Sequence, residues 1–515
     1  MNYFKEEKHL FQIEPKNIDS INIALCFPNT YMIGMTSLGY QTAWKVLNQH
    51  TGVNTLRWFT DAKESRRDTI NCVPDYLGFS FSWELDYINI FKILEDNNIP
   101  LLKKDRNESH PLIFCGGQVA NANPELFSEV FDFFLLGDLE ILGLRFLEKI
   151  VEVKDLKKNK NLEALSSLEG VYCPQNNVGK INFVPPKAKN DLAFSSTLTQ
   201  HSYWPNTFVV EVVRSCPELC RFCLASYGSL PFRTPEVSKL IEICDFGLQY
   251  TNKIGLLGAS VTQHPDFEKL IEHLVLIHKS TPLHVQIASV RADTISKNLA
   301  ENLSALGIKS VTMAIESGSE KLRKIINKKV SNETIKNSIQ TLYDSGIASV
   351  KLYGMVGLPF EDDNDLKETV KLLKEIKEKN KYKKLSFGCS VFVPKAGTPF
   401  QIYGIDKNAD KKLVFYKKEF LKFGVDFRPE SYKWALIQAL ISRGDKTVLS
   451  LLISAYTYGG TLGAFNKAIR EFNATNLIKT DKFIFETWDY KERFPWDNID
   501  GYLKKELIEK QNSSA

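Results

Sequence analysis

The stretch that decides the fold is Glu211-Val-Val-Arg-Ser-Cys-Pro-Glu-Leu-Cys-Arg-Phe-Cys223. Cys216, Cys220 and Cys223 form a C-x3-C-x2-C triplet that follows an apolar, β-branched run. Three thiolates on one loop suit a soft metal centre. A closed structural zinc site wants four ligands, and the next cysteine, Cys244, lies in a helical pattern. Zinc binding and three unrelated buried cysteines remain the alternatives to an iron–sulfur cluster.

Three thiolates on a cubane [4Fe–4S] cluster leave one iron without a protein ligand, where a substrate or cofactor can bind. The chain in this respect resembles the radical S-adenosylmethionine (radical SAM) superfamily, and Phe222 before the last cysteine fits that pattern. The resemblance implies that Cys216, Cys220 and Cys223 are the metal-ligating and catalytic residues. It also implies reductive cleavage of S-adenosylmethionine to a 5′-deoxyadenosyl radical that abstracts hydrogen from a substrate.

Length and composition indicate an ordinary globular chain. The 515 residues imply two to four domains, and 66 basic against 61 acidic residues are too balanced to indicate a nucleic-acid binder. The start lacks the apolar core of a signal peptide, and no apolar run approaches the roughly 20 residues of a membrane span. Nine cysteines, three of them clustered, favour a reducing interior. We therefore expect a cytoplasmic, oxygen-sensitive protein without a membrane or nucleic-acid partner.

Residues 1–150 alternate strand-like and helical patterns. The expected strands are 21–27, 76–82, 112–115 and 133–136, and the expected helices are 38–48, 86–97 and 139–153. This alternation predicts an α/β domain with an open, mostly parallel, Rossmann-like sheet that binds ligands at the carboxyl ends of its strands. Glycine or serine turns follow three of the four expected strands.

The order of those turns resembles the cobalamin-binding fold, whose signature is D-x-H-x-x-G, then S-x-L, then G-G. Asn29 and Tyr31 stand where that signature has Asp and His, so no lower axial imidazole is available. The resemblance implies cobalamin contacts from the three turns, namely Asn29, Tyr31, Gly34, Ser80, Ser82, Gly116 and Gly117. The two adjacent glycines would let the backbone approach the corrin or its nucleotide tail, and a serine hydroxyl would hydrogen-bond that tail. A ligand-free scaffold whose glycines serve turns is the alternative.

The rest of the chain divides into three parts. Residues 151–205 are predicted to be a connector that includes a short hairpin formed by 170–174 and 181–184. Residues 206–400 are predicted to form a partial (β/α)6 barrel, and residues 401–515 a helical C-terminal domain. The six barrel strands are expected at 208–214, 253–257, 283–289, 310–315, 349–355 and 385–393.

Polar and glycine residues fall at the carboxyl ends of the barrel strands, where barrel chemistry lies. In the radical SAM family these positions bind the cofactor, and the resemblance implies contacts from Phe222, Gly258, Ser260, Ser289, Arg291, Glu316, Gly354, Gly357 and Pro359. Ser260 would meet the methionine amino group, Arg291 the methionine carboxylate and Glu316 the ribose hydroxyls or the amino group. The segment 354–359 resembles G-x-I-x-G-x-P, whose backbone flanks the adenine. A surface ion pair and a helix N-terminal acid are the structural alternatives for Arg291 and Glu316.

Segments 390–401, 442–445 and 495–500 resemble a subfamily of radical SAM proteins that carry an N-terminal cobalamin-type domain, the Fe–S oxidoreductase type. The resemblance implies methylation of an unactivated carbon where cobalamin binds, with flavodoxin or ferredoxin as electron donor. Radical cyclisation, rearrangement, sulfur insertion and a non-enzymatic iron–sulfur sensor remain open. Sulfur insertion usually needs a second cluster, for which the chain offers the scattered Cys26, Cys72, Cys115 and Cys173.

Overall fold

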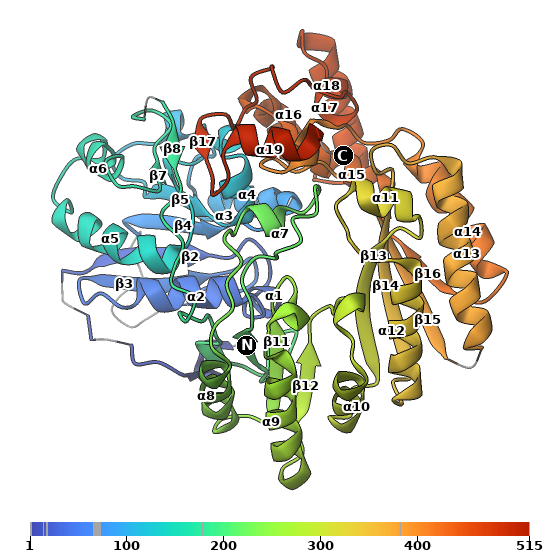
Figure 1. The fold of residues 1–515 in the computed structure, drawn as a ribbon. Helices are drawn as coiled ribbons and strands as arrows, with labels where there is room; N and C mark the ends of the chain where they lie inside the picture. Colours follow the sequence, from blue (N-terminus) through green and yellow to red (C-terminus); the bar gives the residue numbers. More distant parts are fainter. Residues whose placement is uncertain are drawn as a thin grey trace.

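The structure is a computed structural model that describes residues 3–13, 15–16, 19–64, 74–177, 179–381 and 383–513. An N-terminal sheet, blue to teal in Figure 1, lies beside a barrel drawn from green to orange, and the C-terminal helices lie at the top of the view. The fold is α/β with parallel sheets, as predicted. Within the described ranges, none of the helices has both the length and the hydrophobicity that a membrane crossing requires.

The N-terminal sheet has the strand order β3-β2-β4-β5-β6-β7, in which only β7 runs antiparallel to its neighbour. Its strands are β2 (Ile21–Cys26), β3 (Val53–Trp58), β4 (Tyr76–Ser80), β5 (Leu112–Gly116), β6 (Phe133–Leu135) and β7 (Val171–Tyr172). The chain order reverses between β2 and β4, and open parallel sheets bind ligands at the carboxyl ends beside such a switch point.

Strand β2 shows how both faces of this sheet are covered, because side chains alternate across a strand. Ile23 and Leu25 belong to a core with α2 (Leu38–Leu47) and α5 (Leu139–Glu152). Ala24 belongs to a second core that includes residues of α3 and of the C-terminal helices. Those helices are α3 (Tyr87–Glu95), α15 (Tyr432–Arg443), α16 (Leu449–Thr457), α17 (Leu462–Thr475) and α18 (Thr480–Ile484). The C-terminal helices therefore complete the N-terminal sheet as well as covering the barrel.

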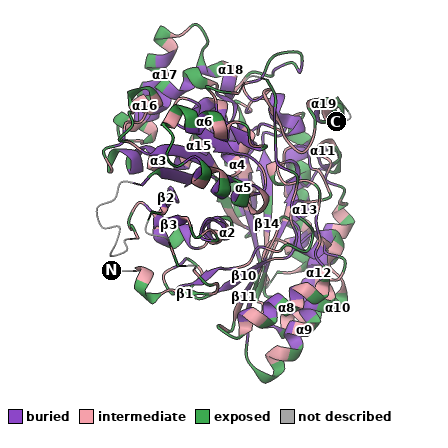
Figure 2. Ribbon diagram, turned by 90° about the vertical axis from the view of Figure 1, so that its left-hand side faces the viewer, coloured by how far each residue is buried: buried purple, intermediate pink, exposed green. Residues whose placement is uncertain are grey.

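The barrel consists of two parallel sheets that continue one another through a single bridge between Val290 and Met313. The strands are β10 (Phe208–Glu211), β11 (Lys253–Leu257), β12 (His284–Ile287), β13 (Ser310–Glu316), β14 (Ser349–Val356), β15 (Lys384–Val391) and β16 (Asp426–Pro429). The outer helices are α8 (Val237–Leu248), α9 (Phe267–Ser280), α10 (Lys297–Ala305), α12 (Asn332–Asp344), α13 (Asp363–Lys379) and α14 (Ala409–Leu421). Figure 2 shows β10, β11 and β14 as buried, with exposed residues on outer helices such as α9.

Two details of the prediction are wrong. The connector strands do not form a hairpin, because β7 pairs with β6 and β8 (Ile181–Asn182) pairs with β17 (Ile499–Asp500). The apolar Val171 and Tyr172 are more fully buried as an edge of the N-terminal sheet. The barrel also has a seventh strand, β16, whose half-exposed sequence Asp426-Phe-Arg-Pro429 lacks an apolar run.

Candidate functional site

The three motif cysteines lie on residues 215–223 between β10 and α7 (Leu224–Tyr227), a segment called the cysteine loop below. Cys220 is buried, whereas Cys216 and Cys223 are half-buried. Ser215 and Leu219 have φ angles of 67° and 49°. Positive φ is uncommon outside glycine, so the loop turns tightly just before Cys216 and again just before Cys220.

The turn at Asn327 holds the middle of the cysteine loop. Asn327 Nδ2 donates hydrogen bonds to the backbone carbonyls of Glu218 (2.8 Å) and Leu219 (3.1 Å). Cys220 Sγ lies 3.9 Å from the carbonyl oxygen of Asn327. Asn327 belongs to no recognisable motif, so its role was not predicted from the sequence.

Arg221, inside the motif, ties the cysteine loop to two helices. Its backbone N–H donates to the carbonyl of Ile326 at 3.0 Å, and its guanidinium donates to the carbonyl of Ile325 at 2.5 Å, the last residue of α11 (Glu320–Ile325). Its Nε donates to the carbonyl of Gln511 on α19 (Lys505–Ser513) at 2.6 Å. Tyr227 hydrogen-bonds the side chain of the same glutamine. The cysteine loop is therefore positioned by distant parts of the chain.

Ser260, which follows β11, reaches the cysteine loop through one glutamine. Ser260 Oγ donates to Gln263 Oε1 at 2.6 Å, and Cys216 Sγ lies 3.6 Å from the same oxygen. Gln263 Nε2 donates to Glu218 Oε1 at 2.6 Å. The structure brings Ser260 to the first cysteine, with Gln263 as an intermediary that the sequence analysis did not name.

Arg291, which follows β12, has carboxylate neighbours already. Its Nη2 lies 2.6 Å from Asp293 Oδ2 and 3.5 Å from Glu218 Oε2 of the cysteine loop. A methionine carboxylate would have to compete with Asp293 for this guanidinium. Ser289, two residues earlier, is half-buried beyond the end of β12.

Glu316 ends β13 in a left-handed conformation, with φ of 64° at a register shift of the strand. Such a conformation costs about 1–3 kcal/mol and persists where surrounding contacts fix it. Lys328 Nζ donates to Glu316 Oε1 at 2.8 Å, and both side chains are buried. Burial works against the charge of Lys328, but the attraction of Glu316 outweighs burial and raises the lysine pKa. A buried ion pair thus stands beside the second cysteine.

Burial disfavours the thiolate forms of Cys216 and Cys220 when no metal is bound. Burial raises the pKa of Cys220 to about 12, with Lys328 opposing that rise, and burial also raises the pKa of Cys216. Iron that binds a thiol displaces its proton, so the nearby cation would favour the metal-bound form.

Zinc and a cubane cluster differ in how closely they hold their thiolates. Among the described residues, no three His, Cys, Asp or Glu side chains converge as the ligands of one metal ion do. Thiolates around one zinc, each with a Zn–S bond of 2.3 Å, lie within about 4 Å of one another. A cubane spreads its thiolates over separate iron atoms, so it accepts a wider loop.

Two of the predicted glycines allow strand ends to approach closely. A Cβ added at Gly258 would lie 2.7 Å from Val213 Cγ2, and one added at Gly354 would lie 2.7 Å from the carbonyl oxygen of Glu316. A larger residue at either position would therefore displace the neighbouring strand end, which at Gly354 is the one that carries Glu316.

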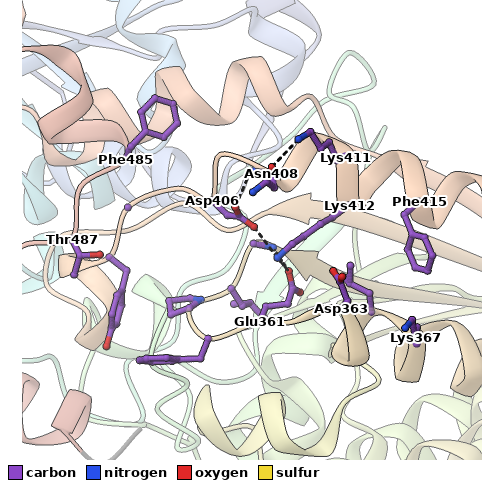
Figure 3. Close-up of a pocket in the computed structure, with 17 residues that line it drawn as sticks. Glu361, Asp363, Lys367, Asp406, Asn408, Lys411, Lys412, Phe415, Phe485 and Thr487 are labelled. Carbon is purple, nitrogen blue, oxygen red and sulfur yellow. Dashed lines mark hydrogen bonds and ion pairs between the residues drawn. The ribbon is translucent and has the colours of Figure 1, made fainter.

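Gly357 and Pro359 lie apart from the cysteines, in a cavity of about 810 Å³ between the starts of α13 and α14. Figure 3 shows Lys412 between two carboxylates of this cavity. Lys412 Nζ lies 2.7 Å from both Glu361 Oε2 and Asp406 Oδ2, and the same Glu361 oxygen accepts the Gly357 N–H at 2.6 Å. The buried ion pair fixes the turn, whose opposite side packs through Leu358 in a small core with Phe222.

A second cavity, the cluster cavity, has a volume of about 720 Å³ and opens onto the cysteine loop. Phe222 and Cys223 line it together with the ends of β14 and β15, the segment before α3, and α15. Its further lining residues include Trp83, Leu85, Ile88, Met355, Ser390, Val393, Lys395, Glu430, Trp434 and Gln438. This cavity joins the third cysteine to all three parts of the chain.

A third cavity, the sheet cavity, measures about 730 Å³ and lies at the carboxyl ends of the N-terminal strands. The predicted residues that line it are Ser80, Ser82, Gly116, Gly117 and, from the barrel, Gly258. It extends along α2, where small residues Gly39, Thr42 and Ala43 form its wall. The buried oxygens Thr42 Oγ1 and Gln118 Oε1 have no hydrogen-bond partner among the described residues. The Thr42 hydroxyl could donate or accept a hydrogen bond, and the Gln118 amide oxygen could accept one.

The first predicted turn does not line the sheet cavity. Tyr31 is fully buried, and its hydroxyl donates to Glu7 Oε1 at 2.6 Å. Asn29 Nδ2 donates to Asp86 Oδ1 at 3.0 Å. A Cβ added at Gly34 would lie 2.4 Å from the ring of Phe59. These three residues pack the structure beneath the cavity.

The cluster cavity and the sheet cavity share three lining residues, Trp83, Leu224 and Lys395. Lys395 forms an ion pair with Glu84, which is buried next to Trp83. Lys395 belongs to the barrel-closing segment and Glu84 to the N-terminal domain. This ion pair therefore links the two domains at the point where the cavities meet.

An ion network joins the two domains on another side of the sheet cavity. Arg214, just before the cysteine loop, lies 3.0 Å from Asp138 and 2.8 Å from Glu140 of the N-terminal domain. Lys187 of the connector also lies 2.8 Å from Glu140, and Arg233 pairs with Asp138 at 2.5 Å. The start of the cysteine loop is thereby attached to the N-terminal sheet.

The cysteines considered for a second cluster are dispersed. Cys26 and Cys115 are buried at the same level of the sheet, but Phe79 of β4 lies between them. Two interstrand spacings put their backbones about 10 Å apart. Cys173 is buried with its Sγ 3.7 Å from the carbonyl of Leu162, and Cys72 lies outside the described residues.

Comparisons with known proteins agree with this architecture. A family model described as "Radical SAM proteins, N-terminal" matches residues 39–174, and one described as "Radical SAM superfamily" matches residues 210–373. An uncharacterised protein of Methanocaldococcus jannaschii is 27% identical over 84% of this chain and 90% of its own length. A tRNA-2-methylthio-N(6)-dimethylallyladenosine synthase of Ehrlichia ruminantium is 28% identical over 38% of this chain and 44% of its own length.

Two solved structures share the fold. The radical SAM methyltransferase TsrM of Kitasatospora setae, with cobalamin and a [4Fe-4S] cluster bound, has a TM-score of 0.55 and 11% identity, with 74% of each chain covered. The cobalamin-dependent S-adenosylmethionine radical enzyme OxsB has a TM-score of 0.54 and 13% identity, with 98% of this chain and 82% of that chain covered. The likeness spans the N-terminal sheet, the barrel and the C-terminal helices. With both family models and the cysteine loop at the mouth of a partial barrel, the chain belongs to the radical SAM superfamily.

Proposed function

We propose that this radical SAM enzyme methylates an unactivated carbon, with a [4Fe–4S] cluster on Cys216, Cys220 and Cys223 and cobalamin in the sheet cavity. The observation that carries the proposal is the junction at Trp83, Leu224 and Lys395. A methyl carrier and a substrate radical have to meet within one shielded space. The two cavities have three lining residues in common. One cavity lies at the third cysteine and the other at the carboxyl ends of the N-terminal strands, so together they would form such a space.

The residues around the cysteine loop suit S-adenosylmethionine, which supplies a 5′-deoxyadenosyl radical when a reduced cluster cleaves it. Ser260 and Gln263 offer polar atoms beside Cys216, and the Glu316–Lys328 pair offers both charges beside Cys220. Phe222 and Met355, which both line the cluster cavity, would border the adenine. The chain's own contribution is to hold these groups rigidly and to exclude water.

The sheet cavity fits a corrin with a nucleotide tail. Gly116 and Gly117 leave the strand ends free of side chains, and the small residues on α2 open a slot for the tail. Thr42 Oγ1 and Gln118 Oε1 are buried polar atoms that lack partners among the described residues, and such atoms normally find one. Cobalamin would supply the methyl group there. Tyr31 does not line this cavity, and no histidine is among its described lining residues, so no imidazole would be available to the corrin there.

The cellular setting follows from the cluster. Every cysteine in the described part of the chain is a free thiol, which supports a reducing cytoplasm as the location. A low-potential one-electron donor is needed to reduce the cluster, and flavodoxin or ferredoxin has that chemistry. We expect the donor to dock near the cysteine loop.

Cobalamin binding tests the proposal first. The reconstituted protein should retain hydroxocobalamin through gel filtration, detected by its corrin absorbance. After reduction to the cob(II)alamin state, electron paramagnetic resonance should lack the nitrogen splitting of an axial imidazole. Gly117→Val should abolish retention while the cluster absorbance stays. A wild-type protein that retains no corrin, or one that shows imidazole coordination from a histidine, would overturn the assignment of the sheet cavity.

A further inference from the structure

The outer half of the cluster cavity has a composition that selects a substrate. The part nearest the cysteine loop, with Phe222, Cys223 and Met355, is the part that S-adenosylmethionine would fill. The remaining wall includes Trp83, Leu85, Ile88, Val393, Lys395, Glu430, Trp434 and Gln438. We infer that this wall binds a small molecule with a flat apolar body and a cationic group, an inference that rests on the proposed function.

Trp83 supplies most of the open aromatic surface of this wall. Its side chain is 48% exposed although it lies at the junction between two domains and lines both cavities. A large aromatic side chain left open inside a cavity offers contact area that a ligand can cover. Trp434 adds a second, half-buried indole from α15, and Leu85 and Ile88 add aliphatic surface. Flat rings are the shape that stacks best on indole faces.

The charge half rests on Glu430 and Lys395. Glu430 follows β16 at the rim of the cavity, and none of the ion pairs or hydrogen bonds among the described residues involves its carboxylate. Lys395, the basic side chain of this wall, is neutralised by Glu84. A cation would therefore meet an unpaired carboxylate and indole faces, both of which attract it. An anion would meet Glu430 without a free counter-charge.

The position of the wall agrees with the chemistry required. Trp83 belongs to the sheet cavity as well, so a ring stacked on it would lie between the place of the methyl group and the place of the radical. Glu430 follows β16, the edge strand of the second barrel sheet. A substrate held at both ends would present the atoms between its ring and its cation toward the cysteine loop.

Fragment binding tests this inference without turnover. We would add 4-fluorophenethylamine to the anaerobic, cluster-loaded and unreduced protein in the presence of S-adenosylmethionine, and follow fluorine line broadening. The amine should bind at least about tenfold more tightly than 4-fluorophenylacetate. Trp83→Ala and Glu430→Gln should each weaken the amine by about tenfold or more, whereas Trp83→Phe should stay within about threefold of wild type. Trp58→Ala and Glu419→Gln, outside this cavity, serve as controls.

Three results would overturn the inference: equal binding of amine and acid, wild-type binding in the Trp83→Ala and Glu430→Gln variants, or displacement of the amine by S-adenosylmethionine. The last would mean that the cofactor alone fills this cavity. Since the assay needs neither cobalamin nor reduction, amine binding with no methyl transfer would count against the proposed function only. Methyl transfer with no amine preference would count against the inference only.

Discussion

Replacing Glu140 by glutamine tests the ion network that attaches the cysteine loop to the N-terminal sheet. Glu140 lies 2.8 Å from both Arg214 and Lys187. Burial disfavours its charged form, but the attraction of these two cations outweighs burial and lowers the carboxyl pKa from 4.5 to about 2. The difference of about 2.5 pKa units corresponds to about 3 kcal/mol of stability at neutral pH.

The sign of the pH dependence follows from the lowered pKa. A carboxyl whose pKa is lower in the folded state stabilises the fold above its unfolded-state pKa, here 4.5. The stabilisation is lost as the pH falls toward about 2, and one unit below 4.5 about 1.4 kcal/mol of it has gone. The difference between wild type and Glu140→Gln should be constant from pH 7 to pH 5 and should shrink below that.

Scanning calorimetry measures this effect. A folding unit of 150–250 residues loses about 2–4 °C per kcal/mol, so the transition of the N-terminal domain should fall by about 6–12 °C in Glu140→Gln at pH 7. Glu163→Gln is the matched control, because Glu163 pairs with Lys160 at 2.8 Å on the exposed surface of the adjoining connector, and exposed pairs contribute little. Equal transition temperatures in the two variants would refute the reasoning. So would a decrease in the Glu140→Gln transition temperature that is as large at pH 3.5 as at pH 7.

Three further substitutions probe the site. Lys328→Met leaves the Glu316 carboxylate buried and unpaired, so chemical denaturation should show that the free energy of unfolding falls by about 3–5 kcal/mol. The double variant with Glu316→Gln should recover most of this loss, and no recovery would contradict the ion-pair account. At Gly117, φ is 112° and an added Cβ would lie 2.6 Å from a backbone oxygen, so Gly117→Ala should lower corrin retention in gel filtration by about tenfold. Gly179→Ala, at φ 103° in open space, should leave retention unchanged. Equal retention in the two variants would contradict the steric argument. Arg221→Lys removes the hydrogen bonds of the guanidinium to two helices. Iron analysis after chelator treatment should find less than about half of the wild-type iron in this variant. Full iron retention would show that the cysteine loop does not need these hydrogen bonds.

The sequence predicted the fold where local pattern and tertiary structure agree. Strand β11 (Lys253–Leu257) begins and ends as expected, because its apolar run coincides with burial and with clear flanking turns. Strand β3 was missed, since its Asn54, Thr55 and Arg57 are polar although the structure buries them. Arg57 is tolerated there because it pairs with Glu7 at 2.6 Å, a partner 50 residues away that no local pattern indicates.

The motif residues of the candidate site could be predicted from the sequence, but the residues that hold the cysteine loop in place could not. Spacing identified the three cysteines, and strand ends identified Ser260, Arg291 and Glu316, all of which lie beside the cysteine loop. Lys328 and Asn327 were missed because they reach the loop from a turn that only the folded barrel brings near. The residues that join the two cavities, such as Trp83 and Lys395, come from different domains. Contacts of that kind depend on domain docking, which no sequence motif encodes.

The most direct test of the account is product analysis under anaerobic conditions. The reconstituted protein, S-adenosylmethionine and a strong reductant would be combined with and without cobalamin, and the nucleoside products measured by mass spectrometry. The account predicts 5′-deoxyadenosine that disappears in the Cys216→Ala/Cys220→Ala/Cys223→Ala variant, and S-adenosylhomocysteine only when cobalamin is present. S-adenosylhomocysteine that forms equally without cobalamin, or 5′-deoxyadenosine that persists in the triple variant, would contradict it.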